Sequence, residues 1–354
     1  ALTQEQIKKQ VEILEDQGHK RLMILTGEHP ELSPIDFVME SLDTIYSVKK
    51  GQGEIRRINV EIAPLEIDEF KRLKSAGIGT YVCFQETYNP EIYKKYHPSG
   101  PKADYLRRLQ VMDKAIQGGI DDFGIGALYG LYDYRFEVLS LLFHANHLDK
   151  TYGVGPHTIS VPRLEPAQNA PTANKVPYPV DDITFKKIVA VLRLSVPYTG
   201  IILTTREKPA LRGDLLDLGI SQMSAGSKTA PDGYTKNEEP GQFSLGDHRT
   251  LDEVIYDVLD HGYIPSFCTG CYRKGRVGAD FMDLAKPGLI NLHCLPNALF
   301  TFVEYLEDYA SNKTKKKGKN VVYSMLDHIQ NENVKQKSKE IINEIEGGKR
   351  DIYF

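Results

Sequence analysis

Three of the four cysteines stand close together in the sequence and could bind a metal. Cys268 and Cys271 form a C-x2-C pair, and Cys294 follows after 22 intervening residues. A C-x2-C pair can bring two thiolates onto one metal ion or cluster. Zinc usually takes four protein ligands, whereas an iron–sulfur cluster can be held by three cysteines with one iron left open. The spacing favours an iron–sulfur site, although Cys294 could instead be a buried structural thiol.

A second group of polar or small residues stands at the ends of apolar, strand-like segments, where α/β barrels carry their active sites. Glu28 and Glu86 could accept hydrogen bonds from an amine or from ribose hydroxyls, and Arg206 could hold a carboxylate through two hydrogen bonds. A salt bridge to a neighbouring glutamate is the alternative role for Arg206. Gly124 and Gly126 would let a flat group approach the backbone. The predicted site also takes in residues Thr26, Gly27, Tyr88 and Ser224.

His157 begins a strand-like segment, so it should face the opposite, amino-terminal mouth of a barrel. A histidine at that place is commonly exposed or a capping residue, and the same holds for His144 and His147 at the end of the preceding helix. If a cysteine-bearing appendage covers this mouth, His157 becomes a candidate metal ligand.

The segments that must position these residues alternate between strand-like and helix-like patterns, which indicates a parallel sheet. Seven strands with helical crossovers predict an α/β fold, a (β/α)8 barrel with its first strand missing; an open doubly wound sheet is the alternative. The predicted strands are 21–28, 58–64, 80–88, 120–130, 157–164, 200–207 and 221–229. The predicted helices are 3–17, 33–49, 66–75, 103–117, 135–149, 182–195 and 251–259.

Composition excludes several classes of partner. The net charge of −4 gives no general attraction to nucleic acid or anionic membranes, and no apolar run could cross a bilayer, so we expect neither as a partner. Four cysteines are few for a disulfide scaffold, which favours a reducing compartment and a cytoplasmic protein. The amino-acid composition changes near Tyr263, where Gly, Pro, Cys and basic residues become frequent. This change predicts a barrel domain at 1–262 and a mainly helical, cluster-binding domain at 263–354. The basic run 313–319 is predicted to be a solvated linker.

Several stretches resemble the radical S-adenosylmethionine (SAM) aromatic lyases, a family that includes the thiamine-pathway tyrosine lyase. They extend over nearly the whole chain and read LTGEHPE, QETYNPEIYKKYHPSGPKADYLRRL, GIDDFGIGALYGLYDYRFE, GPHTISVPRLEPA, LTTRE and SAGSKT. The C-x2-C-x22-C spacing, within CTGCYRKGRVGADFM and HCLP, is similar to the hydrogenase-maturation member of the family. The resemblance implies a radical-SAM TIM-like barrel with a C-terminal cluster-binding extension.

The resemblance also implies a place for each ligand. SAM would bind with its amino group near Thr26–Glu28, its ribose near Glu86, its carboxylate held by Arg108 and its adenine facing Gly124 and Gly126. The carboxylate of L-tyrosine would be held by Arg206, with Ser224 and Tyr88 nearby.

The implied reaction is that of a carbon–carbon lyase. L-Tyrosine would be cleaved to p-cresol and 2-iminoacetate (dehydroglycine). The second product would pass to an auxiliary [4Fe–4S] cluster at Cys268 and Cys271 and become CO and cyanide on iron, for delivery to hydrogenase maturation proteins or a carrier during H-cluster assembly. The family's histidine ligand to an additional iron maps to His157.

The chain departs from the family in one respect. The family binds its radical-generating [4Fe–4S] cluster through a C-x3-C-x2-C motif after the first strand, and this sequence contains no such motif. We therefore expect a partial chain that holds at most the C-terminal cluster and makes no radicals. The three clustered cysteines weigh against the thiamine-pathway lyase, and a non-catalytic scaffold with a structural zinc is the remaining alternative.

Overall fold

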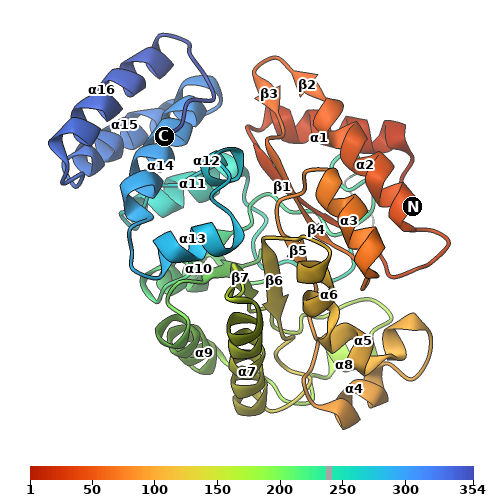
Figure 1. Ribbon diagram of the computed structural model, residues 1–354. Coiled ribbons are helices and arrows are strands. Elements are labelled where there is room, and N and C mark those ends of the chain that lie inside the picture. Colours follow the sequence, from red (N-terminus) through yellow and green to blue (C-terminus); the bar gives the residue numbers. More distant parts are fainter. Residues whose placement is uncertain (237–240) are drawn as a thin grey trace. The chain divides into compact units, whose positions relative to one another are not determined.

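A seven-stranded sheet is the framework of this computed structural model, which describes residues 1–236 and 241–354. The strand order is β1-β4-β5-β6-β7-β8-β9, and the pairs from β4 to β9 are parallel (Figure 1). The strands are β1 (Arg21–Leu25), β4 (Arg57–Glu61), β5 (Tyr81–Val82), β6 (Phe123–Gly126), β7 (Thr158–Ser160), β8 (Gly200–Leu203) and β9 (Gln222–Met223). Each predicted strand overlaps one of them, so the predicted parallel α/β sheet is confirmed.

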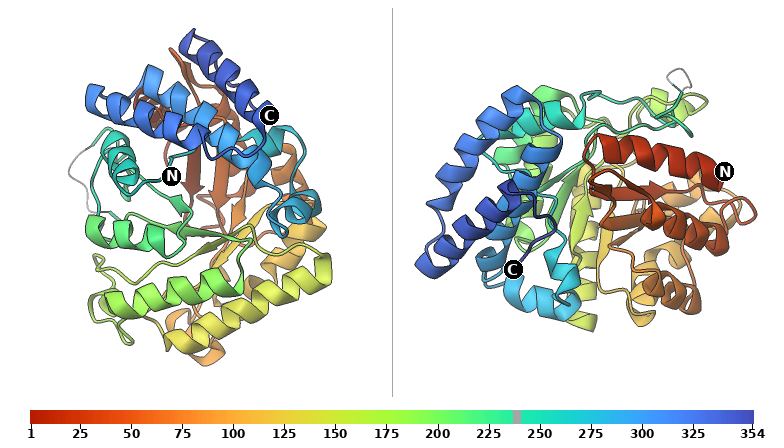
Figure 2. Two further views of the ribbon diagram at one scale, coloured as in Figure 1. Left: turned by 90° about the vertical axis from the view of Figure 1, so that its left-hand side faces the viewer. Right: turned by 90° about the horizontal axis from the view of Figure 1, so that it is seen from above.

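Helices follow the strands in sequence order and form a continuous layer. α3 contacts α6, α6 contacts α7, α7 contacts α9, and α9 contacts α10. A doubly wound sheet reverses its strand order at a switch point, whereas this order never reverses. The open doubly wound alternative is therefore wrong, and Figure 2 shows the sheet curving from β1 toward β9 as in a barrel. The helices are α1 (Gln4–Asp16), α2 (Ile35–Ser47), α3 (Ile67–Ser75), α4 (Pro90–Tyr96), α5 (Tyr105–Leu109), α6 (Val111–Gln117), α7 (Tyr134–Tyr152), α8 (Pro171–Asn174), α9 (Asp182–Ser195) and α10 (Pro209–Asp217), with a 3-10 turn, η1 (Pro101–Ala103).

The chain forms two compact units. The sheet unit comprises residues 1–10, 22–47 and 57–248, and the helical unit comprises 11–21, 48–56 and 249–354. The predicted domain boundary after residue 262 stays a prediction. The helical unit also includes the helix α11 (Leu251–Asp260), which precedes that boundary.

The core of the sheet unit is built from strands that are buried on both faces, as parallel sheets require. Ile58 and Val60 of β4 are fully buried, and so are Phe123 of β6, Ile159 of β7 and Ile201 of β8. These apolar side chains explain why the strand positions could be read from the sequence.

Polar side chains fill a layer at the amino ends of the strands. Arg57 Nη2 donates to Asp122 Oδ2 at 2.7 Å and to Thr80 Oγ1 at 2.9 Å, while Arg57 Nε donates to Asn59 Oδ1 at 3.0 Å. His157 Nδ1 lies 3.7 Å from Asp122 Oδ1. His157 immediately precedes β7, so its predicted place at the amino end of a strand is confirmed.

A buried ion pair ties the carboxyl ends of β8 and β9 together. Arg212 of α10 pairs with Asp247, and neither side chain is exposed. Arg212 Nη2 also donates to Ser224 O, which follows β9. Asp247 N donates to Thr205 O, which follows β8, at 3.0 Å. This network fixes the two strand ends that carry Arg206 and Ser224.

We expect Asp247→Ala to lower the free energy of unfolding by about 3–5 kcal/mol, because it leaves the Arg212 charge buried without its partner. Urea unfolding of the chain without cofactors measures the change. Asp214→Ala is a suitable control, because Asp214 forms an ion pair with Lys186 at 2.6 Å on the surface and should contribute about 1 kcal/mol or less. Equal effects of the two substitutions would contradict the assignment of a structural role to the Arg212 pair.

The helical unit contains a hairpin and six helices among its described residues. Helix α14 lies at its centre and contacts α15 and α16 through fully buried Leu299, Phe300 and Phe302. The hairpin is β2 (Lys49–Lys50) with β3 (Gly53–Glu54), and the helices are α11 (Leu251–Asp260), α12 (Gly270–Arg273), α13 (Gly278–Ala285), α14 (Asn291–Asp308), α15 (Asn312–Leu326) and α16 (Glu332–Glu346). The expected mainly helical extension is therefore present.

The basic run 313–319 belongs to α15, so the prediction of a linker is wrong. Lys319 pairs with Glu307 at 2.9 Å, and Lys317 pairs with Asp260. The other face of the helix buries Val322 and Leu326. Paired charges on one side and apolar side chains on the other stabilise a helix where the composition alone suggested solvent-exposed chain.

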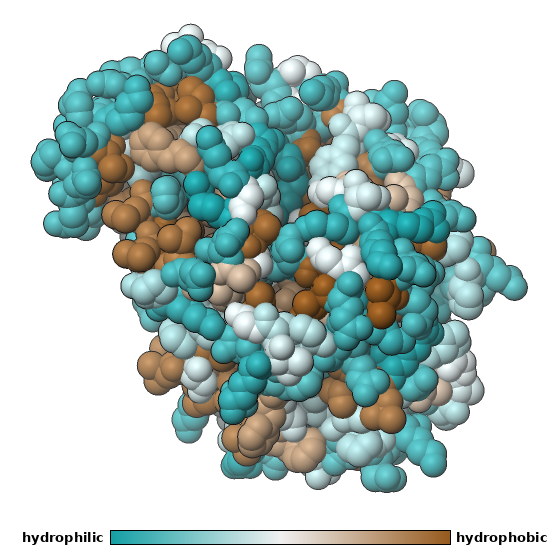
Figure 3. All heavy atoms as spheres, in the orientation of Figure 1, coloured by the Kyte–Doolittle hydropathy of each residue, from teal (hydrophilic) through white to brown (hydrophobic). Residues whose placement is uncertain are grey.

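The face drawn in Figure 3 is mainly hydrophilic, with apolar side chains set among polar ones. Phe143 of α7 and Leu194 of α9 are among the most exposed, at 72% and 83%. None of the helices in the described part of the chain has the length and apolar character that crossing a bilayer demands.

Candidate active site and cysteine site

Glu28 and Glu86 share two cations at the carboxyl ends of β1 and β5. Arg108 Nη1 donates to Glu28 Oε1 at 2.7 Å, and Arg108 Nη2 lies 3.5 Å from Glu86 Oε1. Lys102 Nζ donates to Glu86 Oε1 at 2.6 Å and lies 3.5 Å from Glu28 Oε1. The structure therefore brings together three of the residues predicted to bind a cofactor, and it adds Lys102.

Glu86 has a strained backbone. Its φ of 67° lies in the left-handed region, which residues other than glycine rarely occupy. The backbone is held there because Leu128 N donates to Glu86 O at 2.8 Å and Glu86 forms a parallel bridge with Ala127. Strain of this kind persists where the surroundings fix it, often at functional sites. The pairing with the neighbouring strand continues through this residue, and the Glu86 carboxylate lies beside Arg108 and Lys102.

The pKa values of two neighbouring glutamates move in opposite directions. Burial alone would raise the pKa of Glu86, but Lys102 and Arg108 outweigh burial and hold that pKa below its usual value. Burial raises the pKa of Glu61, at the end of β4, to about 7; repulsion from Glu86 adds to the rise and Arg206 opposes it. Glu86 is therefore ionised at neutral pH, while Glu61 is close to half protonated.

We expect Glu61→Gln to flatten the pH dependence of stability. The pKa of Glu61 is raised from 4.5 to about 7, so the folded chain binds the additional proton between these values. The stability that this group contributes is complete below the unfolded pKa and is lost as the pH rises through the folded pKa. The stability of Glu61→Gln relative to the unmodified chain should therefore rise by up to about 3 kcal/mol between about pH 5 and pH 8.

Urea unfolding across this pH range measures the difference. Glu40→Gln, at an exposed position of α2, is the matched control and should follow the unmodified chain. A constant difference between Glu61→Gln and the unmodified chain at every pH would contradict the raised pKa.

Gly124 and Gly126 allow the strands to pack closely. A Cβ at Gly124 would lie 2.4 Å from Thr158 Oγ1, and a Cβ at Gly126 would lie 2.8 Å from Ser160 O. Because both atoms belong to the neighbouring strand β7, packing explains the two glycines without a ligand. A role of Gly124 and Gly126 in adenine binding stays a prediction.

Thr26 and Gly27 extend β1 toward Glu28. Thr26 N donates to Glu61 O at 3.2 Å, and Gly27 O accepts a hydrogen bond from the Ser33 hydroxyl. The position that a Cβ on Gly27 would take has no neighbouring atom within 4 Å. The backbone beside Glu28 is therefore open to a ligand.

Arg206, after β8, is half-buried and has an unused donor, its Nε. Its Cζ lies 3.4 Å from the centroid of the Phe243 ring. Arg206 Nε is buried without a hydrogen-bond partner among the described residues. Burial lowers the pKa of Arg206, and the charges of Glu61 and Glu86 oppose this effect. A buried donor without a partner costs free energy that a bound acceptor would recover.

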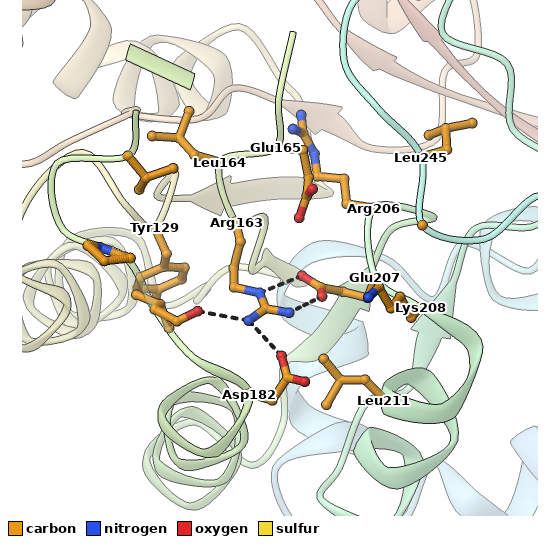
Figure 4. Close-up of a pocket in the computed structure, with 14 residues that line it drawn as sticks. Tyr129, Arg163, Leu164, Glu165, Asp182, Arg206, Glu207, Lys208, Leu211 and Leu245 are labelled. Atoms are coloured by element: carbon orange, nitrogen blue, oxygen red, sulfur yellow. Dashed lines mark hydrogen bonds and ion pairs between the residues drawn. The ribbon is translucent and has the colours of Figure 1, made fainter. Parts of the chain in front are cut away.

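A cavity of about 390 Å³ lies beside Arg206 (Figure 4). In its wall, Arg163 forms ion pairs with Glu207 and, at 2.9 Å, with Asp182. Arg206 extends away from this group and lies beside Glu165 (Figure 4). Because Arg163 is already engaged by two carboxylates, Arg206 is the better receptor for a ligand carboxylate at this cavity.

The other two predicted catalytic residues, Ser224 and Tyr88, lie in different surroundings. Ser224 N donates to Leu203 O at 3.0 Å, which places Ser224 at the end of the strand next to that of Arg206. Tyr88 is buried, and its hydroxyl is hydrogen-bonded to His144 Nδ1 of α7 at 2.9 Å. The phenol of Tyr88 is thus engaged with the helix layer, and its role near tyrosine stays a prediction.

The three candidate histidines have different surroundings. His144 pairs with Tyr88, and His147 Nε2 lies 2.8 Å from Asp113 Oδ1. His157 is buried beside Asp122, and burial lowers its pKa. A lowered pKa keeps the imidazole neutral, which is the form that binds metals. The assignment of His157 as an iron ligand stays a prediction.

Cys268, Cys271 and Cys294 lie within electrostatic range of one another in the helical unit. The Cys294 side chain is exposed, which does not fit a buried structural thiol; partial desolvation raises its pKa to about 11, and the thiols of Cys271 and Cys268 add to the rise. Burial also raises the pKa of Cys268; a hydrogen bond from Gly270 N to Cys268 Sγ at 3.3 Å opposes the rise, and so does the charge of Arg276. Thiols that repel one another as thiolates are stabilised together by a shared metal centre.

These donors fit an iron–sulfur cluster better than a zinc ion. Among the residues that the structure describes, no group of three or more His, Cys, Asp or Glu side chains is already arranged to hold a metal ion. The three thiols lie near one another and are enough for a cluster with an open iron, whereas a closed zinc site would need His293, next to Cys294, as its fourth ligand. Cys83 is buried after β5, and the printed sequence has no cysteine set that fits a radical-generating cluster.

Sequence reasoning missed Lys102 and Glu61. Lys102 stands in the short 3-10 turn η1 of a loop without periodicity, and Glu61 is the last residue of a strand whose end was predicted three residues later. The run of charged residues at strand ends could have suggested Glu61, but nothing in the sequence links Lys102 to Glu86.

The fold is that of one class, the radical SAM enzymes. Residues 1–142 match the Radical SAM superfamily, and residues 160–264 match the Biotin and Thiamin Synthesis associated domain. The 2-iminoacetate synthase of Salmonella typhimurium is 31% identical over 261 residues, which cover 73% of this chain and 67% of that protein.

Two solved structures are also similar. A crystal structure of HydG, a maturase of the [FeFe]-hydrogenase, is 51% identical with a TM-score of 0.97, covering 100% of this chain and 77% of that one. HydG from Carboxydothermus hydrogenoformans is 44% identical with a TM-score of 0.82, covering 96% and 74%. The chain belongs to the radical SAM family of lyases that includes 2-iminoacetate synthase and the HydG maturases.

Proposed function

We propose that this chain binds L-tyrosine and SAM for a radical lyase reaction and holds an auxiliary iron–sulfur cluster. The observation that carries the proposal is the half-buried Arg206, whose buried Nε has no partner among the described residues and which lines a cavity. The carboxylate of an amino acid would supply the missing acceptor. The charge cluster of Glu28, Glu86 and Arg108 lies on the same edge of the sheet, at the ends of β1 and β5.

The proposed reaction breaks the Cα–Cβ bond of tyrosine. The products p-cresol and 2-iminoacetate together contain all the atoms of tyrosine. Each turnover would also consume one SAM, two electrons from an external reductant and one proton, and would release methionine and 5′-deoxyadenosine. Arg206 would orient the carboxylate and Ser224 would lie beside it. The residues that hold SAM would be Glu28, Glu86 and Arg108, which offer two carboxylates for its amino and ribose groups and one guanidinium for its carboxylate. SAM is the radical source in this family.

The cysteine site would serve the second half of the reaction. Cys268 and Cys271, with Cys294 as the third thiol, would hold an iron–sulfur cluster. The cluster would supply iron that binds the fragments of 2-iminoacetate. That molecule divides into CO, hydrogen cyanide and water without loss or gain of atoms. His157 is the proposed ligand of an additional iron, and a hydrogenase maturation protein or carrier is the proposed acceptor, in the cytoplasm.

A second candidate is the thiamine-pathway reaction, which ends at 2-iminoacetate. The 31% identity to a 2-iminoacetate synthase supports it. The clustered thiols of the helical unit have no use in that reaction, and they favour the maturase reaction.

The test compares two polypeptides under anaerobic reducing conditions. The chain as printed should form neither 5′-deoxyadenosine nor p-cresol, because its cysteines do not fit a radical cluster. The same chain joined behind a C-x3-C-x2-C segment should form p-cresol from tyrosine, and CO only when the cysteine site is loaded. Formation of 5′-deoxyadenosine by the printed chain would refute the first expectation. Absence of p-cresol from a joined chain that cleaves SAM would refute the lyase function.

A further inference from the structure

The segment 350–354 packs directly against the turn that carries Cys268 and Cys271. Tyr353 Cβ lies 3.3 Å from the position that a Cβ on Gly270, between the two cysteines, would occupy. Arg276 Nη2 donates to the main-chain O of Phe354 at 2.8 Å, and Arg276 N donates to Cys271 O at 2.8 Å. One arginine thus joins this segment to the cysteine turn.

The same segment reaches the helix that carries Cys294. Asn297 stands three residues after Cys294 on α14, and its Oδ1 accepts a hydrogen bond from Phe354 N at 2.8 Å. Asn297 Nδ2 lies 3.1 Å from the position of a Cβ on Gly270. The ring of Phe354 packs edge-on against Phe300 of the same helix, with centroids 5.2 Å apart. The buried Asn297 side chain therefore contacts both the segment and the cysteine turn.

Charged side chains from α12 hold the rest of the segment. Arg273 forms an ion pair with Asp351 and lies 5.5 Å from the centroid of the Tyr353 ring. Lys274 Nζ is also 5.5 Å from this centroid. Asp351 has a φ of 61°, a left-handed conformation that is kept because Glu304 accepts a hydrogen bond from Asp351 N. The segment is fixed at several points, and those at Tyr353 and Phe354 adjoin the cysteine turn.

We propose that residues 351–354 are a positioning segment. This segment holds the Cys268–Cys271 turn against the end of α14 that carries Cys294, for cluster binding. The inference rests on the proposed function of the cysteine site. A small cysteine turn has little structure of its own, so its thiols bind a cluster tightly only when other parts of the chain fix their directions. Tyr353, Arg276 and Asn297 provide that support.

The test measures cysteine alkylation in the cluster-free chain, with peptide mass spectrometry to follow each thiol separately. Tyr353→Ala, and a chain that ends at Ile352, should alkylate Cys268 and Cys271 about 3- to 10-fold faster, as the loss of one or two supporting contacts predicts. Tyr353→Phe keeps the ring and should behave like the unmodified chain. Tyr323→Ala removes an exposed tyrosine from α15 of the same unit and is the control.

Cys83 makes the experiment specific. It is buried in the other unit, so it reports global unfolding. Faster alkylation of Cys268 and Cys271 with Cys83 still protected supports the positioning role. Unchanged rates in both variants, or equal acceleration of Cys83, would overturn it. Iron uptake is measured separately: if the unmodified chain takes up no iron while the variants still alkylate faster, the proposed cluster fails and the positioning role stands.

Discussion

Replacement of Cys268 and Cys271 by alanine should abolish cluster uptake. After anaerobic reconstitution with iron and sulfide, the unmodified chain should hold about four iron atoms and the double variant none. The reason is that the C-x2-C pair supplies two of the three thiols within range of one another, and one thiol cannot retain a cluster. Iron analysis and electron paramagnetic resonance measure the result.

Single substitutions sharpen this experiment. Cys83→Ala should leave iron uptake unchanged, because Cys83 is buried in the core of the sheet unit. Cys294→Ala should reduce uptake if Cys294 is the third ligand, and should leave it unchanged if Cys294 is a structural thiol. An unmodified chain that binds zinc and takes up no iron would instead establish the scaffold alternative.

Substitution of Arg206 should have the largest effect on the lyase reaction. In the chain joined to a C-x3-C-x2-C segment, Arg206→Ala should reduce kcat/KM for tyrosine by about 100- to 10,000-fold, because two charge-assisted hydrogen bonds to the substrate carboxylate are lost. Arg206→Lys should recover little of this loss, because an ammonium group keeps the charge but not the planar pair of donors.

A third variant distinguishes the loss of the carboxylate contact from the loss of a positive charge near the cavity. Lys208→Ala removes an exposed cation from the wall of the same cavity and should change kcat/KM by less than about 3-fold. Formation of 5′-deoxyadenosine without tyrosine should persist in all three variants, because the proposed SAM contacts lie elsewhere. Equal losses for Arg206→Ala and Lys208→Ala would contradict the specific role of Arg206.

Much of the fold could be predicted because buried parallel strands are apolar on both faces. Ile58, Phe123 and Ile201 show this, since each lies in a run that was recognisable in the sequence. Strand ends were less predictable. The segment 80–88 contains only the short strand Tyr81–Val82, although backbone hydrogen bonds to the next strand continue as far as Gln85. No periodicity in the sequence predicts the left-handed backbone of Glu86.

The candidate sites were predicted in part for the same reason. The ends of successive strands lie along one edge of the sheet, so Glu28 and Glu86 could be grouped without coordinates. Their shared partner Lys102 comes from a loop, and only the folded chain brings it within 2.6 Å of Glu86. The hydrogen bond between Tyr88 and His144 joins a strand end to a helix 56 residues away and has no signature in the sequence.

The raised pKa of Glu61 has a consequence for the energetics of ligand binding. Arg206 holds this pKa down to about 7, so a carboxylate that occupies the guanidinium would remove part of that support and raise the pKa further. Tyrosine binding would then be coupled to the uptake of a proton by Glu61. The heat of binding near neutral pH would therefore depend on the ionisation enthalpy of the buffer. Under the proposed function, the negative charge of the tyrosine carboxylate would replace that of Glu61. The net charge contributed by these two carboxyl groups would then be the same before and after binding.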